Sequence, residues 1–191
     1  MGANIPNGIG ASPRRKEDQR FLTGAGNYTD DINFQGQTYA CFLRSPHAHA
    51  AIRKIDTRAA AAAPGVVAIF TGADLAEAKV GGLPCGWLIT DVNGQPMKEP
   101  PHPLLAQGKA NHVGDQVAVI IAETYLQAKD AAELIEVDYD VLDAIADVAT
   151  ATQPGKPQVH DIAPNNVCYV WGHGDKAAVD KAFAGAAHVT T

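Results

Sequence analysis

The residues of this chain with the clearest chemical potential are two histidines, His47 and His49, separated by one residue. In an extended strand their side chains project from the same face, about 7 Å apart, because the rise is about 3.3 Å per residue. Two imidazoles at that spacing can bind one metal ion, but a metal site also needs a third ligand and groups that orient the ligands. The surrounding segment, residues 44–52, could instead mark a position in a much larger enzyme, so the pattern alone leaves both interpretations open.

A third ligand for such a metal ion would have to come from elsewhere in the chain. The histidines available are His102, His112 and His160, and nothing in their spacing ties them to the pair. The opposite face of the same predicted strand is apolar and is expected to face the core; it consists of Ala48, Ala50 and Ile52. Because this arrangement leaves His47 and His49 on the polar face with Arg53, the sequence favours a solvated or interfacial pair over a metal site.

Two glycine-rich segments have the composition of anion-binding loops. Gly24-Ala25-Gly26 lacks the G-x-G-x-x-G pattern and follows a charged segment rather than a buried strand, so it is interpreted as a turn. Gly172-His173-Gly174-Asp175 precedes a predicted helix, whose N-terminus could bind an anion. Since Asp175 occupies the cap position and would repel an anion, this segment is interpreted as a structural cap.

The remaining candidates are a cysteine and an acidic group. Cys85 is the residue to test as a reactive thiol, but no His or Lys stands beside it to activate it, so we expect a packed thiol in an interfacial loop. Asp138, Asp140 and Asp143 lack the ligand order of a calcium loop and indicate a solvated face. No Ser-His-Asp arrangement or activated carboxylate pair can be argued. The sequence therefore assigns no catalytic, cofactor-binding or metal-binding residue.

Composition narrows the class of protein. The 191 residues are enough for one or two domains, and a net charge of -6 without a Lys/Arg run argues against a nucleic-acid surface. No apolar run is long enough to span a membrane, and charged residues rather than an apolar segment follow Arg14-Arg15, so we expect a cytoplasmic protein. The widely spaced Cys41, Cys85 and Cys168 are expected to be reduced thiols.

Strands and short helices alternate along the predicted chain. The strands are expected over 38–44, 66–70, 117–122, 135–139 and 168–171, with another beginning at 187–191, and the helices over 59–63, 74–79, 124–134 and 175–185. The first strand alternates apolar residues on both faces and is predicted to be buried on both. Thr124 and Gln127 form a capping box, and the strand–helix–strand order around them predicts a crossover unit. Residues 81–108 lack any period and predict a long loop that crosses an interface.

Several segments taken in order resemble one enzyme family. RFLTGAGNYTDD at 20–31 and RSPHAHA at 44–50 resemble the start of the large subunit of molybdenum hydroxylases, the family of xanthine dehydrogenase, aldehyde oxidase and aerobic carbon monoxide dehydrogenase. Further matches are PGV at 64–66, FTGADL at 70–75, MKEPPHP at 97–103, HVGDQVA at 112–118, AAE at 131–133, VDY at 137–139 and GD at 174–175. One departure is Leu142-Asp143-Ala144-Ile145, where the family commonly has proline after the leucine. The matching motifs follow in the family's order over nearly the whole chain, and this order makes the resemblance specific.

The resemblance implies an α+β fold, the α/β-hammerhead, with a mixed sheet and packed helices. It implies an N-terminal arm over 1–15, the hammerhead domain over 16–148, and a linker with the start of a molybdopterin-binding domain over 149–191. The family's glycine-rich cofactor segments and its proposed glutamate base lie in later domains. No position here matches them, so no catalytic or cofactor-binding residue is carried over.

The resemblance also implies a parent enzyme. Its reaction would be oxidative hydroxylation of an aldehyde, an N-heterocycle or a similar carbon centre, or CO oxidation, with oxygen from water. The molybdopterin cofactor would lie in the parent subunit, and 2Fe-2S clusters and commonly FAD on partner subunits or domains. The expected partners are the remainder of the large subunit, an iron–sulfur small subunit and a flavin subunit. The alternatives are a non-catalytic binding module that reuses the hammerhead, or a small His-based metal-binding protein.

Overall fold

The structure is a computed structural model that describes residues 9–11 and 13–190. It divides into two units, Met1–Gln37 and Thr38–Thr191. Residues 1–8 and 12 of the predicted N-terminal arm, and Thr191 at the end of the last predicted strand, lie outside the described residues.

The first unit contains α1 (Asp18–Leu22) and the short 3-10 helix η1 (Thr29–Asp31). A turn follows α1, in which the backbone N–H of Ala25 donates to the carbonyl of Arg20 at 2.7 Å. Gly24 has a φ of 73° within this turn, a conformation that glycine adopts without steric cost. The predicted turn at 24–26 is therefore confirmed.

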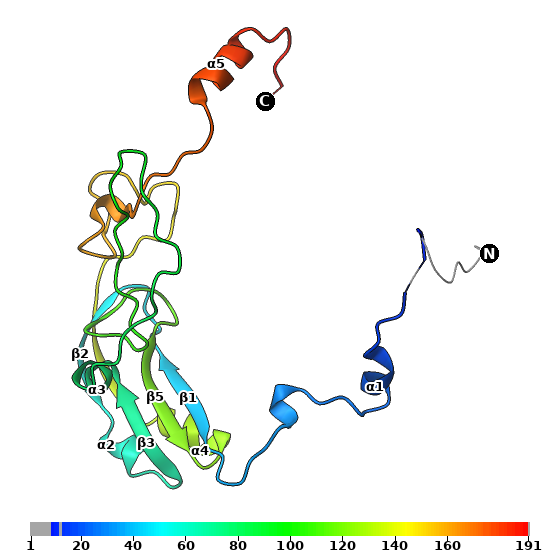
Figure 1. Cartoon of the computed structure of the whole chain (residues 1–191). Helices are drawn as coiled ribbons and strands as arrows, with labels where there is room; N and C mark the ends of the chain where they lie inside the picture. The colour runs from blue at the N-terminus through cyan, green and yellow to red at the C-terminus, as the bar shows by residue number, and fades with distance from the viewer. Residues whose placement is uncertain (1–8, 12, 191) are drawn as a thin grey trace. The chain divides into compact units, whose positions relative to one another are not determined.

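The strands of the second unit that the structure describes form two antiparallel sheets. In the first sheet, β5 (Gln116–Ala122) lies between β1 (Tyr39–Arg44) and β3 (Val66–Thr71), which Figure 1 shows side by side. The second sheet has the order β4 (Lys109–Ala110), β2 (Ala50–Asp56) and β6 (Glu136–Val141). Every strand pair in both sheets is antiparallel. The predicted α+β class is confirmed, but the predicted mixed sheet is wrong, because no strand pair among the described residues is parallel.

The predicted crossover unit is wrong, although its strands and helix exist. The helix α4 (Tyr125–Ala132) follows β5, but β6 then pairs antiparallel with β2 in the other sheet. Both edges of β5 are already hydrogen-bonded to β1 and β3, so no edge of β5 is available to β6. At the start of α4, the Thr124 hydroxyl accepts from the backbone N–H of Gln127 at 3.2 Å, which confirms Thr124 as the cap. The Gln127 side-chain oxygen accepts from the Thr124 hydroxyl at 2.8 Å, so the return bond of the predicted capping box is not formed.

The core lies between one face of the first sheet and α4. Ala128 and Ala131 of the helix are fully buried against Ile120 and its neighbours on β5. Alanines on the helix allow its backbone to approach the sheet closely, and the dense packing excludes water from both. The short helix α2 (Arg58–Ala61) adds the buried Ala60 to the same core.

The opposite face of the first sheet differs from the prediction that its first strand is buried on both faces. Phe42 and Phe70 lie opposite Val119 in the ladders, and they are 42% and 43% exposed. Cys41 and Leu43 instead pack against the core. Alternation of apolar residues therefore identified the strand correctly, but one of its faces stays partly exposed among the described residues.

The segment between α3 (Gly72–Glu77) and β4 is a long loop, as predicted. Its backbone bonds to the segment after the second sheet, from Val92 N–H to the Val170 carbonyl and from Lys98 N–H to the Cys168 carbonyl, both at 3.0 Å. Two isolated bonds do not make a ladder, so the predicted strand over 168–171 is wrong. The described residues 187–190 likewise form no strand.

Two helices complete the second unit. The 3-10 helix η2 spans Pro164–Asn166, and α5 spans Lys176–Ala184. The Asp175 carboxylate accepts from the backbone N–H of Ala178 at 3.0 Å, which confirms the predicted structural cap. Among residues 9–11 and 13–190, no helix has the length and apolar character needed to cross a membrane.

Candidate functional site

His47 and His49 lie in a turn between the two sheets, not in one strand. Residues 45–49 connect β1 to β2, and the Ser45 hydroxyl accepts from the backbone N–H of His47 at 3.1 Å. His47 packs edge-on against Tyr139, with ring centroids 4.9 Å apart. His49 is only 7% exposed. The prediction that both imidazoles share a polar face is wrong, because the turn interrupts the two-residue period of a strand.

The His49 ring is oriented by one hydrogen bond. Its Nδ1 lies 2.9 Å from the backbone carbonyl of Asp143, and a carbonyl only accepts, so Nδ1 carries the hydrogen. In the neutral imidazole this leaves Nε2 as an acceptor. Nε2 is buried and has no hydrogen-bond partner among the described residues.

The three histidines considered as a third ligand come together around one cavity, which we call the histidine pocket. It has a volume of about 390 Å³, and its polar lining includes His102, His112, His160, Lys109, Asn111 and Asp115. Nothing in the sequence spacing indicated this grouping. Within the described part of the chain, however, no group of three or more His, Cys, Asp or Glu side chains is arranged to hold a metal ion.

Asp115 organises one wall of the histidine pocket. Its carboxylate accepts from the backbone N–H of Asn111 at 2.9 Å and lies 3.8 Å from Nδ1 of His112. The sequence argument missed Asn111 and Asp115 as site residues. The available signal was an Asn and an Asp four residues apart in a Gly-containing segment between two strands, a composition typical of a turn closed by a side-chain carboxylate.

The lysine that lines the histidine pocket, Lys109, has an acidic neighbour. The Lys109 ammonium lies 3.7 Å from the Asp161 carboxylate. Burial lowers the pKa of the His160 imidazole, and the proximity of Lys109 and His49 lowers this pKa further. His160 is therefore uncharged at neutral pH.

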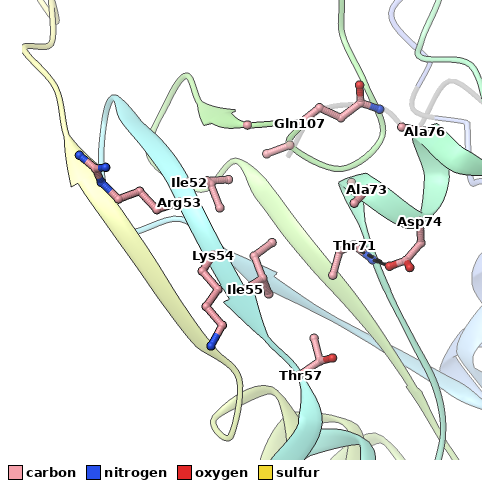
Figure 2. A pocket seen from close by; sticks show the side chains of 13 residues that line it. Ile52, Arg53, Lys54, Ile55, Thr57, Thr71, Ala73, Asp74, Ala76 and Gln107 are labelled. Atoms are coloured by element: carbon pink, nitrogen blue, oxygen red, sulfur yellow. Dashed lines mark hydrogen bonds between the residues drawn. The ribbon is translucent and has the colours of Figure 1, made fainter.

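A second cavity, of about 420 Å³, lies between β2 and α3. Figure 2 shows Ile52 and Ile55 of β2 facing Thr71 and α3 across it. The Asp74 carboxylate accepts from the backbone N–H and the hydroxyl of Thr71, both at 2.6 Å, and these bonds lower the pKa of Asp74. The two basic lining residues also have acidic neighbours, in the pairs Arg53–Asp140 and Lys54–Asp56. With its charges engaged in this way, the cavity presents no group for acid–base or nucleophilic chemistry.

The cysteine and the acidic strand show no catalytic arrangement. Cys85 is exposed, and its Sγ lies 3.3 Å from the carbonyl of Trp87, so a packed environment for this thiol would have to come from a partner. Asp138 and Asp140 are exposed on β6, which confirms the predicted solvated face.

Comparison with known proteins agrees with the geometry. Residues 23–143 match the family model described as aldehyde oxidase and xanthine dehydrogenase, a/b hammerhead domain. The chain is 37% identical, over 97% of its length, to the nicotine 6-hydroxylase large subunit of Paenarthrobacter nicotinovorans, and 35% identical, over 93%, to the carbon monoxide dehydrogenase large chain of Afipia carboxidovorans. It spans 22% of the length of each of these relatives.

Solved structures show the same likeness. Reconstituted CO dehydrogenase from Oligotropha carboxidovorans superimposes with a TM-score of 0.75 at 34% identity, covering 95% of this chain and 23% of that one. Quinoline 2-oxidoreductase from Pseudomonas putida 86 superimposes with a TM-score of 0.67 at 40% identity, covering 80% of this chain and 19% of that one.

Proposed function

Because this chain belongs to the aldehyde oxidase and xanthine dehydrogenase hammerhead family, we propose that it is the N-terminal scaffold part of a molybdenum hydroxylase large subunit. The parent enzyme hydroxylates an aldehyde, an N-heterocycle or a similar carbon centre, or oxidises CO, with oxygen from water. The segment itself does no chemistry and supports the molybdenum domains. In this proposal residues 1–15 form an arm, 16–148 the hammerhead domain, and 149–191 a linker and the start of the next domain.

The observation that carries the proposal is the exposed apolar row on the first sheet. Phe42, Val119 and Phe70 lie side by side across three strands, and the two phenylalanines are more than two-fifths exposed. A sheet face of this kind is normally buried against another layer of the same protein. We assign its cover to the remainder of the large subunit, since relatives of this chain are more than four times as long.

The cofactors of the parent enzyme are assigned to other residues. We assign the molybdopterin cofactor to later domains of the large subunit, where the family resemblance puts the glycine-rich cofactor segments. The 2Fe-2S clusters and FAD are assigned to partner subunits in the cytoplasm. No catalytic step is assigned to this segment.

The proposed burial of the exposed apolar row by the remainder of the large subunit can be tested. The 191-residue chain and the remainder of its subunit are expressed as separate polypeptides. The variant Phe42→Ser/Phe70→Ser should weaken their association about 100-fold, since burying two partly exposed phenyl rings contributes about 3 kcal/mol. The measurement is the dissociation constant of the two purified polypeptides. The control is Tyr125→Ser/Leu126→Ser, which removes two exposed apolar side chains from α4. Equal affinity of the Phe42→Ser/Phe70→Ser variant and the unaltered chain would argue against this interface.

The assignment of molybdenum to other residues has its own test. The purified 191-residue chain, produced in cells that make the molybdopterin cofactor, should contain no stoichiometric molybdenum by elemental analysis. The reason is that the resemblance puts the segments that contact the molybdopterin cofactor in later domains of the large subunit. One molybdenum per chain would overturn the assignment of a purely supporting role.

A further inference from the structure

The central strand of the second sheet has a partner along only part of one edge. β4 is two residues long and pairs only with Ala50 and Ala51 of β2. One further backbone bond on this edge runs from the N–H of Ile52 to the carbonyl of Gly108, at 2.8 Å. Residues 54–56 of β2 are paired with β6 and, among the described residues, have no strand partner on the other edge.

The segment that precedes β4 does not continue along this edge. The backbone N–H of Ala106 donates to the carbonyl of Gln116 at 2.6 Å, so the chain before Gly108 is bound to the start of β5, in the first sheet. A strand edge carries backbone N–H and C=O groups that need hydrogen-bond partners, and an open stretch beside an existing ladder is a template for another strand. The edge of residues 54–56 can therefore accept an added strand that lies in line with β4.

The cavity of about 420 Å³ shown in Figure 2 borders this open edge. Its lining comes from residues 52–55 and Thr57 on one side and from Thr71 and α3 on the other, with residues 106–108 at the end where β4 begins. Since β6 occupies the opposite edge of β2, the cavity lies on the β4 side of this strand. A strand added to residues 54–56 would occupy this space.

The walls of this cavity suit a polypeptide backbone better than a charged ligand. The wall formed by α3 presents the small, exposed side chains of Ala73 and Ala76, beside which a backbone has room to lie. On the opposite wall, Ile52 and Ile55 are half-buried, so a strand that covered them would remove further apolar surface from water. The charged lining residues already have partners in the chain and leave no free charge to attract an ion.

We propose that the open edge of β2 at residues 54–56 accepts an extended segment from the remainder of the large subunit, which lies in this cavity antiparallel to β2. Backbone hydrogen bonds fix its register, and its alternate side chains are apolar where they meet Ile52 and Ile55. The inference rests on the proposed function, because its occupant is the remainder of the large subunit. This chain spans 22% of the length of its relatives, so most of such a subunit lies outside it.

Amide hydrogen exchange followed by mass spectrometry tests the added strand. In the full-length large subunit, the amides of residues 54–56 that face the cavity should exchange at least about tenfold more slowly than in the 191-residue chain, because a hydrogen-bonded amide exchanges only when its bond opens. The amides bonded to β6 are protected in both proteins, so the difference reports the open edge alone. Equal exchange of residues 54–56 in the two proteins would overturn the proposal.

A variant that fills the cavity separates strand addition from a general stabilisation of the chain. Ala76→Trp places an indole ring in the cavity from an exposed position of α3, so residues 54–56 of the full-length subunit should exchange as fast as they do in the 191-residue chain. Glu77→Trp adds the same ring to the same helix outside the lining and should keep the slow exchange. Slow exchange in a folded Ala76→Trp subunit would contradict the proposal. If Ala76→Trp does not fold, the comparison of the unaltered proteins decides.

The occupant of the edge and the scaffold role are tested separately. If a second copy of this chain supplies the strand, slow exchange of residues 54–56 will appear in the 191-residue chain alone and increase with its concentration, which would overturn the assigned occupant. If the 191-residue chain binds the remainder of the subunit through Phe42 and Phe70 while residues 54–56 still exchange rapidly, the scaffold role stands and the added strand is rejected. Slow exchange in the full-length subunit, without association of the separate polypeptides, would reject the apolar interface and keep the added strand.

Discussion

Replacing Ile120 with alanine is expected to lower the free energy of unfolding of the 191-residue chain by about 3–4 kcal/mol. Ile120 lies on β5, the central strand of the first sheet, and is completely buried against the alanines of α4. The loss has two parts: the favourable transfer free energy of the three removed carbon atoms, and the cost of a cavity that neither the sheet nor the helix can close. Urea denaturation followed by circular dichroism measures this difference.

The neighbouring residue supplies the matched control. Ile121 has the same side chain on the same strand, but it faces the other side of the sheet, where it is only partly buried. Ile121→Ala should therefore cost about 1 kcal/mol. A loss in Ile120→Ala no larger than that in Ile121→Ala would contradict the location of the core.

Replacing Gly72 with alanine is expected to destabilise the chain by about 2 kcal/mol. A Cβ atom at this position would lie 2.1 Å from the backbone oxygen of Ala106 and 3.1 Å from that of Leu105. Leu105 and Ala106 are almost fully buried, so this backbone has little freedom to move. Alanine favours a helix over glycine by about 1 kcal/mol, but the overlap with a buried backbone costs about 3 kcal/mol, the upper end of the usual range, and exceeds that gain.

Gly81 offers the control for this substitution. A Cβ atom there meets nothing within 4 Å, and its φ is not positive, so Gly81→Ala should change stability by less than about 0.5 kcal/mol. Thermal unfolding of both variants, compared with the unaltered chain, checks the prediction. Equal melting temperatures of Gly72→Ala and the unaltered chain would mean that the start of α3 and the segment before β4 are not in close contact.

The two cavities illustrate how paired charges limit a site. Arg53, Lys54 and Asp74 border the cavity in Figure 2, yet each has a partner in the chain. In the histidine pocket, the Lys109 ammonium likewise lies 3.7 Å from the Asp161 carboxylate, whereas the Asp115 carboxylate has no lysine or arginine within salt-bridge distance among the described residues.

The types and spacing of neighbouring residues were sufficient to predict many of the helices and strands. The apolar runs predicted β3 and β5, and the cap residues Thr124 and Asp175 predicted the starts of α4 and α5. These features depend on residues a few positions apart, so they are visible in any short window of the chain. The ordered motifs likewise identified the family without reference to tertiary contacts.

The pairing of strands that are distant in the chain could not be predicted from local sequence patterns. The apolar alternation of β1 does not reveal that Phe42 stays partly exposed among the described residues, and the order β5–α4–β6 does not reveal that β6 joins the other sheet. Ala50 and Ala110 are 60 positions apart, and only the register of β2 with β4 opposes them.

The sequence by itself determined the strands β1, β3, β5 and β6, the caps of α4 and α5, the turn at Gly24 and the family of this protein, because each rests on neighbouring residues or on ordered motifs. Only the tertiary structure decided that His49 is buried and that His102, His112 and His160 share one pocket. The physical reason is that burial and hydrogen-bond satisfaction depend on which distant segments meet, and this is set by the packing of the two sheets as a whole.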